Sequence, residues 1–336
     1  MKILAIGDPH AKIDNSREIT LLTEKLVHLI SREQPDVVIV MGDLAHNFAR
    51  MYLPAWKSII AFMDGISSVS KKMYYIVGNH DYINNSQYLT DDHFFTVFQS
   101  WKGRSVDIVE RPTWHNEILM VPYVYPGRFS EMLEKDTPGD FMAAKAIFCH
   151  QEFKNSKMGG ILSTNGDVWH PDMPMVYNGH IHDRDLLQKN ILNIGAPYQT
   201  SFGDGSVKSV EMIYISGKKI KSEPIDLHMP KKITHKLTSD KFKSFSKDTI
   251  KAILNSEDKH RIIITGTYEE MSKLRKSKEY KELAQKVKIV PKYTDTFKRK
   301  TVHNKSFEDI FAEVLKKESL LVQQECEEVM RNVYKA

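Results

Sequence analysis

Short runs of three to five apolar residues recur through the first 180 positions and are bounded by Gly, Asp, Asn or Pro. Runs of this length and punctuation are typical of buried strands. They are Ile3–Ile6, Val37–Met41, Tyr74–Val77, Ile118–Val121, Ala146–Phe148 and Met175–Tyr177. Helical spacing of apolar residues over 15–34, and again around Trp56, predicts helices between these strands. The pattern therefore predicts a βαβαβ beginning, and hence an α/β domain whose sheet is covered by helices.

The pattern changes after Pro230. The residues that follow predict a small, separate α-β-α-β module. Its expected parts are a helix through Phe242 and Ile253, a strand Arg261–Thr265, a charged helix Glu269–Lys286 and a strand Val287–Val290 stopped by Pro291. The last residues, 306–336, are amphipathic and predict two helices, which would pack on their own domain or bind in the groove of a partner.

Composition is that of an ordinary globular protein, with 41% apolar and 27% charged residues in 336. No stretch approaches the ~18 uncharged apolar residues of a membrane span, so no membrane partner is expected. Cys149 and Cys326 are far apart, which argues against a disulfide framework or a cysteine zinc site and favours a reducing intracellular compartment.

Charge is unevenly distributed, because the net charge of +5 conceals a basic block. Residues 231–305 hold 21 Lys and Arg against 9 Asp and Glu. This block is a candidate surface for a polyanion. Solvated lysine-rich helices explain the same charge, and the run Lys298-Arg299-Lys300 is equally consistent with a basic linker.

Asp, Asn and His residues follow five of the predicted strands. In an open α/β sheet these positions meet outside the carboxyl ends of the strands, where ligands bind. They are Asp8, His10, Asp43, His46, Asn79, His80, Asp81, His150, His180 and His182. Each alone is explained by a turn, a helix cap or a surface histidine. All five groups in this order, each after an apolar run, indicate a functional site.

Carboxylates and neutral imidazoles suit divalent ions such as Mn, Fe and Zn. Asp8 and His10 are two positions apart and share one face of an extended chain, as do His180 and His182. Two neighbouring ions need a bridging ligand, and Asp43 is the residue expected to bridge them. Such a pair of ions stabilises the attacking and leaving oxygens in phosphoryl transfer.

The series from Asp8 to His182 resembles the motifs of the calcineurin-like metallophosphoesterase superfamily. The resemblance implies a four-layer α-β-β-α sandwich with two divalent metal ions at the strand ends. One metal would be held by Asp8, His10, Asp43 and His182, and the other by Asp43, Asn79, His150 and His180. His80 matches the catalytic histidine of the superfamily, and Asp81 would orient it.

A narrower resemblance is to the SbcD type of double-strand-break repair nuclease, in the compact form of tailed phages. It is carried by Gly42-Asp43-Leu44-Ala45-His46 and by the stretch from Asn193 to Asp204. It implies that His46 supports cleavage and that the cofactor is manganese, with magnesium as the alternative. It also implies a homodimer, with contacts around Trp56 or Tyr88–Phe98.

The expected domains are a nuclease domain over 1–229, a basic DNA-contacting α+β capping domain over 230–300 and a helical tail over 306–336. By resemblance the tail binds an SbcC-type coiled-coil ABC ATPase. The leading hypothesis is a metal-dependent DNA exonuclease and endonuclease in the cytoplasm, or in the host cytoplasm if the chain is viral. Two alternatives stay open: a stand-alone phosphatase or cyclic-nucleotide phosphodiesterase, and a non-catalytic scaffold.

Overall fold

The computed structural model describes residues 1–244 and 247–295. Two six-stranded sheets form the first domain, in the orders β14-β13-β1-β2-β3-β4 and β11-β12-β10-β7-β6-β5. The strands of the first sheet are β1 (Lys2–Ile6), β2 (Val37–Val40), β3 (Met73–Ile76), β4 (Val106–Val109), β13 (Val210–Ser216) and β14 (Lys219–Ile225). Those of the second are β5 (Thr113–His115), β6 (Ile118–Val121), β7 (Ala146–Cys149), β10 (Met175–Asn178), β11 (Asp185–Gln188) and β12 (Ile191–Asn193).

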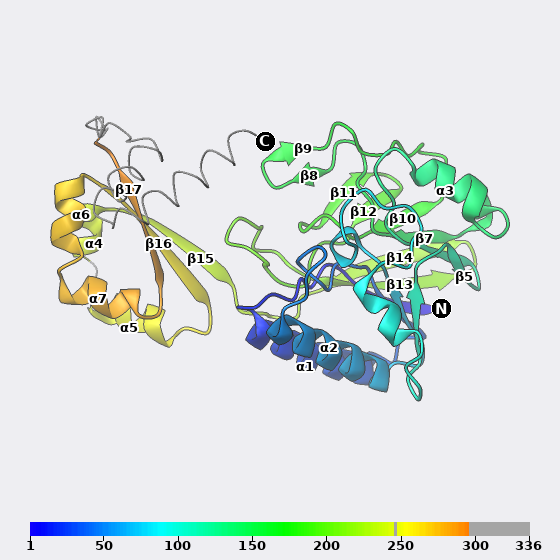
Figure 1. The fold of residues 1–336 in the computed structure, drawn as a ribbon, viewed down its shortest axis with the longest axis horizontal. Helices are drawn as coiled ribbons and strands as arrows, with labels where there is room; N and C mark the ends of the chain where they lie inside the picture. The colour runs from blue at the N-terminus through cyan, green and yellow to red at the C-terminus, as the bar shows by residue number, and fades with distance from the viewer. Residues whose placement is uncertain (245–246, 296–336) are drawn as a thin grey trace, which may run out of the picture.

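Helices cover the outer faces of the two sheets (Figure 1). They are α1 (Ser16–Glu33), α2 (Leu53–Val69) and α3 (Phe129–Asp136). Short 3-10 turns follow β3 (Asn79–Asp81), precede β4 (Phe94–Phe98) and precede β7 (Phe141–Ala143). The helix expected over 15–34 is confirmed as α1, which ends at Gln34 in the left-handed conformation. No helix in this described part of the chain is long and apolar enough to cross a membrane.

Alternate residues of each central strand enter different cores, which makes the layers of the sandwich. In β1, Ile3 and Ala5 point between the sheets, where they meet side chains such as Phe148 of the second sheet. Leu4 and Ile6 point the other way, into the core shared with α1 and α2. A third core lies between the second sheet and α3. The four-layer α-β-β-α sandwich is thus confirmed.

A small module follows, with a parallel sheet in the order β15-β16-β17. Its elements are β15 (Lys232–Thr238), α4 (Ser239–Lys243), α5 (Lys247–Asn255), β16 (Lys259–Gly266), α6 (Tyr268–Leu274), α7 (Lys278–Ala284) and β17 (Lys288–Tyr293). Its apolar core is its own and includes Phe242, Ile262, Ile264 and Leu283. We call residues 232–293 the capping module.

Three predictions about this module are wrong in detail. The single helix expected through Phe242 and Ile253 is two helices, α4 and α5. The single helix expected over Glu269–Lys286 is two helices, because the Ser277 side chain accepts a hydrogen bond from the Tyr280 N–H and starts α7 anew. Pro291 does not stop the last strand: β17 lies at the edge of the sheet, where a missing N–H is tolerated. The strand β15 was not predicted. The predicted tail, 306–336, lies outside the described residues.

Candidate active site

The ten residues predicted for the site come together at the carboxyl ends of five strands. Asp8 and His10 follow β1, Asp43 and His46 follow β2, Asn79, His80 and Asp81 follow β3, His150 follows β7, and His180 and His182 follow β10. Three of these strands belong to one sheet and two to the other. The site therefore lies where the carboxyl ends of both sheets meet.

Asn79, His150 and His180 form one compact group of donor atoms. The Oδ1 of Asn79 lies 2.9 Å from His150 Nε2 and 3.1 Å from His180 Nδ1. The two imidazole nitrogens are 3.2 Å apart. Asp43 Oδ2 completes the group at 3.4 Å from His150 Nε2. These are the four residues predicted to share one metal.

His10 and His182 form the second group, with Nε2 atoms 3.0 Å apart. At this separation both nitrogens could bind a single ion with bonds of about 2.1 Å. Asp43 Oδ2 lies 3.7 Å from His10 Nε2 as well. Asp43 thus stands between the two groups, the position that the bridging prediction requires.

Backbone carbonyls fix which ring nitrogen of two histidines carries a proton. His150 Nδ1 donates to the Met41 carbonyl at 2.7 Å, so Nε2 is the nitrogen that faces the oxygens of Asn79 and Asp43, the donor atoms of the same predicted metal group. His80 Nδ1 donates to the His46 carbonyl, also at 2.7 Å, which leaves its Nε2 for a substrate atom. Hydrogen bonds that orient an imidazole through the nitrogen pointing away from the site are typical of metal and acid–base sites.

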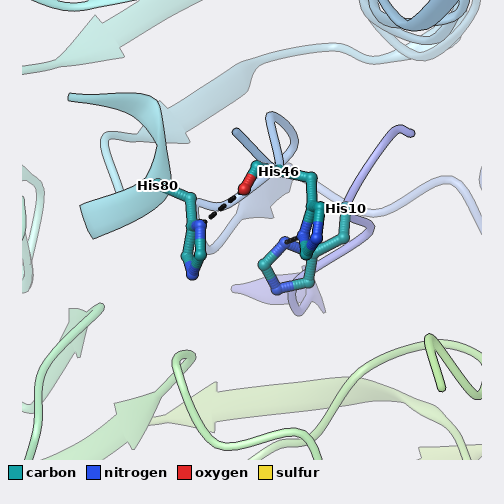
Figure 2. A group of neighbouring side chains, drawn as sticks. All are labelled: His10, His46 and His80. Carbon is teal, nitrogen blue, oxygen red and sulfur yellow. Dashed lines mark hydrogen bonds between the residues drawn. The ribbon is translucent and has the colours of Figure 1, made fainter. Parts of the chain in front are cut away.

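Figure 2 shows His10, His46 and His80 as a cluster of rings. His46 Nδ1 lies 3.3 Å from His10 Nδ1, and the rings of His46 and His80 are nearly parallel. The Phe48 ring stacks on the His80 ring with 4.3 Å between the ring centroids. His46 therefore touches both a predicted metal ligand and the predicted catalytic histidine.

The role predicted for Asp81 needs a correction. Its carboxylate accepts from the backbone N–H groups of Asp43, Ala45 and Gly78 and from the hydroxyl of Tyr75. Those bonds hold the loop that carries Asp43, whereas His80 is held by the His46 carbonyl. The Asp81 carboxylate is completely buried, and among the described residues it makes no hydrogen bond to the His80 ring.

The loops that carry the ligands are tightly packed and locally strained. His10, Asp43 and His180 all have positive φ, between 47° and 66°, a region that non-glycine residues rarely adopt and that clusters at functional sites. A Cβ at Gly78 would lie 2.3 Å from Asp43 Oδ1. A larger residue there would push the bridging carboxylate out of place.

Electrostatics favour ionised carboxylates and neutral imidazoles in most of the site. Burial opposes ionisation of Asp43, but the neighbouring His150 outweighs it and holds the pKa of Asp43 well below its usual range. Burial and the charge of His150 lower the pKa of His180 to about 4. Burial opposes protonation of His150 too, yet Asp43 and Asp8 raise its pKa, so a cation is stabilised at this point.

Two residues that orient His182 were not assigned a role from the sequence. Thr200 Oγ1 lies 3.2 Å from His182 Nδ1, and Asp204 Oδ2 lies 3.8 Å from it. Asp204 also accepts from the N–H groups of Thr200 and Ser201 and from both their hydroxyls. The stretch Asn193–Asp204 was used only for the SbcD-type resemblance. Its position shortly after His182, the last predicted ligand, is the signal that could have pointed to these two residues.

The donor set fits divalent metal ions. Asp8 Oδ2 is buried and has no hydrogen-bond partner among the described residues, an arrangement that costs free energy unless another group binds it. Histidine and carboxylate ligand atoms converge within 4.8 Å in two clusters, His10 with His46 and His80, and Asp43 with His150 and His180. Fold and site together define a metallophosphoesterase, a hydrolase that acts on phosphoesters with divalent metals.

Comparison with known proteins agrees. Residues 1–184 match the family model described as calcineurin-like phosphoesterase. The chain is 32% identical over 288 residues to "Putative phosphoesterase 078R" of Invertebrate iridescent virus 3, which covers 84% of this chain and 81% of that protein. It is 32% identical over 283 residues to "Putative phosphoesterase 244L" of Invertebrate iridescent virus 6, which covers 82% and 98%. The chain belongs to the calcineurin-like phosphoesterase family.

Proposed function

We propose that this protein is a metal-dependent DNA exonuclease and endonuclease of the SbcD type, with manganese as its metal and magnesium as the alternative. Asp8, His10, Asp43 and His182 would hold one ion, and Asp43, Asn79, His150 and His180 the other. When bound, the ions would supply Lewis-acid stabilisation of the charge that develops on the phosphoryl oxygens. The residues of the chain account for the remaining steps.

His80 is the residue proposed to hold a proton for the leaving oxygen. Its Nδ1 is fixed on the His46 carbonyl, and its side chain lines a cavity of about 590 Å³ together with Asp43 and His182. A protonated Nε2 at that position can donate to the 3′-oxygen as the phosphodiester breaks. The backbone N–H of His80 donates to Asp43 Oδ1 at 2.9 Å, so the acid and the bridging carboxylate keep a fixed spacing.

One observation carries the preference for a nucleic acid: the loop that orients a metal ligand also holds the capping module. Thr200 and Asp204 contact His182, as described above. In the same loop, Gln199 Oε1 accepts from the Lys232 N–H at 2.7 Å, and the Phe202 ring lies 4.7 Å under the guanidinium of Arg261. Lys259 pairs with Glu18 of α1 at the same junction. A small phosphoester needs no such coupling between catalytic site and basic module.

The capping sheet has a basic face that none of the described helices covers. Ile262 and Ile264 of β16 point into the core formed with α4–α7, so the preceding Arg261 and its register partner Lys288 point to the other face. Lys236 and Lys292 lie on that face as well. Figure 1 shows the helices of this module on the side of its sheet away from the first domain. The three lysines on this face are exposed, whereas Arg261 packs on Phe202. Three exposed cations on one face suit phosphates read without sequence specificity.

The proposal includes a homodimer and an ATPase partner. An apolar groove of about 420 Å³ is lined by Met51, Leu53, Trp56, Phe94 and Val97. Leu53 is 65% exposed and Val97 58% exposed, and this is the region around Trp56 and Phe98 where dimer contacts are expected. Leu53→Glu is expected to give a monomer in light scattering, and an unchanged mass would show that the dimer does not use this groove.

The coiled-coil ATPase is proposed to bind 306–336, and deletion of that tail is expected to abolish co-purification of the ATPase with this protein.

The test of the function is cleavage of a labelled linear duplex and a labelled single strand with Mn, with Mg and with EDTA. Bis-p-nitrophenyl phosphate is the small control substrate. Mn-dependent degradation of DNA that is lost in His80→Ala supports the nuclease. Hydrolysis of the small diester, with DNA intact even after the ATPase is added, would reject the nuclease and leave a stand-alone phosphatase or phosphodiesterase.

A further inference from the structure

The β8–β9 hairpin is an exposed element that the proposed chemistry does not use. β8 (Lys157–Met158) pairs antiparallel with β9 (Ile161–Leu162) through the turn Gly159-Gly160. Gly159 has φ of 64°, a conformation that glycine adopts without strain. All six residues are exposed. In Figure 1 the hairpin lies at the edge of the first domain nearest the capping module.

The base of the hairpin is buried and is joined by hydrogen bonds to the residue that follows a predicted metal ligand. Ser156 and Ser163 at its base are buried, and they pair through the Ser163 N–H and the Ser156 carbonyl at 2.9 Å. Asp167, just beyond, accepts from the Gln151 side chain at 2.8 Å. Gln151 is completely buried and directly follows His150. The hairpin is therefore held in a constant position relative to the site.

The hairpin forms part of the active-site cavity. The cavity that contains Asp43 and His80 is also lined by Lys157, Met158 and the glycines of the turn. Within the described part of the chain, Lys157 forms no ion pair with an acidic side chain. A cation at this wall is placed to attract a second phosphate of the substrate, next to the one that reacts.

Apolar side chains accompany that cation. Met158 is 42% exposed and Ile161 is 74% exposed, and they are register partners across the hairpin. Leu162, the register partner of Lys157, is 55% exposed. In a nucleic acid the apolar surfaces are the faces of the bases, and they are accessible only where the bases are unpaired and unstacked.

We propose that the β8–β9 hairpin determines specificity by gripping unpaired nucleotides beside the scissile phosphodiester. Lys157 Nζ binds a flanking phosphate, and Met158 and Ile161 pack against a base. This inference rests on the proposed nuclease function and deepens it, because it names single-stranded DNA, or a frayed end, as the preferred substrate. A blunt duplex offers the hairpin a phosphate but no base face.

Three variants of the full-length protein test this with Mn. Lys157→Gln removes the cation, the double variant Met158→Ser/Ile161→Ser removes the apolar contact, and Lys154→Gln is a control at an exposed lysine outside the cavity. Each is assayed for kcat and KM on a labelled single strand, the matching blunt duplex and bis-p-nitrophenyl phosphate. Thermal melting checks that each variant is folded.

For Lys157→Gln, the ratio of kcat/KM on the single strand to that on the small diester should fall about tenfold, mainly through KM. The slope of log KM against log salt concentration should fall by about 0.7, the value for one phosphate contact on a single strand. For Met158→Ser/Ile161→Ser, the preference for single strand over duplex should fall about tenfold with the salt slope kept. Lys154→Gln should match the wild type.

The outcomes separate the two proposals. If the wild type cleaves DNA but both hairpin variants keep its substrate ratios and salt slope, the hairpin proposal is wrong and the nuclease stands. Equal losses on all three substrates would also overturn it, since the hairpin would then act on the catalytic site itself. If the wild type hydrolyses the small diester and neither DNA, even after the ATPase is added, the nuclease function fails and the hairpin proposal falls with it.

Discussion

The floor and the rim of the active-site cavity are built in opposite ways. The floor consists of the ligand loops: Asp8, Asp43 and His150 are buried, and each makes several short polar contacts. The rim consists of the β8–β9 hairpin, where a cation and apolar side chains are exposed. The basic face of the capping sheet lies outside the cavity, and we group it with the rim because its lysines are exposed too. The floor can thus support one chemistry only, while the rim is free to select which phosphoester reaches it.

The largest expected effect is on the floor, and it should not depend on the substrate. His80→Ala removes the group proposed to protonate the leaving oxygen, so kcat should fall about 10²–10⁴-fold. The fall should be similar for DNA and for bis-p-nitrophenyl phosphate, because both expel an oxygen at the same place. A loss confined to DNA would contradict this prediction and would mean that His80 selects the substrate, as the rim does. Metal content, measured by mass spectrometry, should stay at the wild-type value.

A smaller effect, on metal affinity, is expected for a residue that contacts a predicted ligand from outside the floor. Asp204→Asn removes the charge that faces His182 Nδ1 and disturbs the hydrogen bonds to Thr200 and Ser201. Groups that orient metal ligands typically change metal affinity 10–100-fold. Titration of chelated protein with Mn should therefore show binding weakened within that range. Asp172→Asn, at an exposed surface carboxylate, is the matched control and should bind like the wild type.

Changes in the rim should alter KM in a way that depends on the substrate and on the salt concentration. Replacing Lys288 and Lys292 by Ala removes two cations from the open face of the capping sheet. The KM for single-stranded DNA should rise about tenfold, and the salt slope should fall by about 1.4 if both contact phosphates. The kcat should hold, since neither residue lines the cavity. A fall in kcat with KM unchanged would mean that the module supports the floor instead.

The floor was readable from the sequence and the rim was not. Each predicted ligand follows an apolar run, and parallel strands bring their carboxyl ends to one edge, so the pattern of strand ends predicted that Asp8, Asp43 and His150 lie together. Lys157 and Met158 lie in a stretch with ordinary polar composition, and only the fold places them in the cavity. The strand β15 was missed because its sequence, K-I-T-H-K-L-T, is half polar and lies at an edge.

The partners of Asp81 show the same limit within the floor. Its place beside His80 in the sequence suggested a pair, but the tight turn over Asn79–Asp81 directs its carboxylate to the loop after β2. Sequence neighbours in a 3-10 turn project in different directions. The residues of the site could therefore be predicted, whereas the hydrogen bonds between them depend on backbone directions that the motifs do not contain.

The smallest predicted effect concerns His46, which joins floor and rim. Burial, together with the charge of Lys12, lowers the pKa of His46 to about 4 from 6.5. Between these values the ring is neutral in the folded protein and charged in the unfolded chain, which then binds one more proton. Its contribution to stability is therefore present above pH 6.5 and lost as the pH falls toward 4.

Urea unfolding of the chelated protein at pH 7 and pH 5 measures this. His46→Gln cannot titrate, so its loss of stability between the two pH values should be smaller than that of the wild type by about 1 kcal/mol, a figure reduced for the partly exposed ring. His28→Gln, at an exposed histidine of α1, is the control and should behave like the wild type. An equal pH dependence of the free energy of unfolding in the wild type and His46→Gln would contradict this prediction. It would mean that solvent reaches His46 freely, as it reaches the residues of the rim.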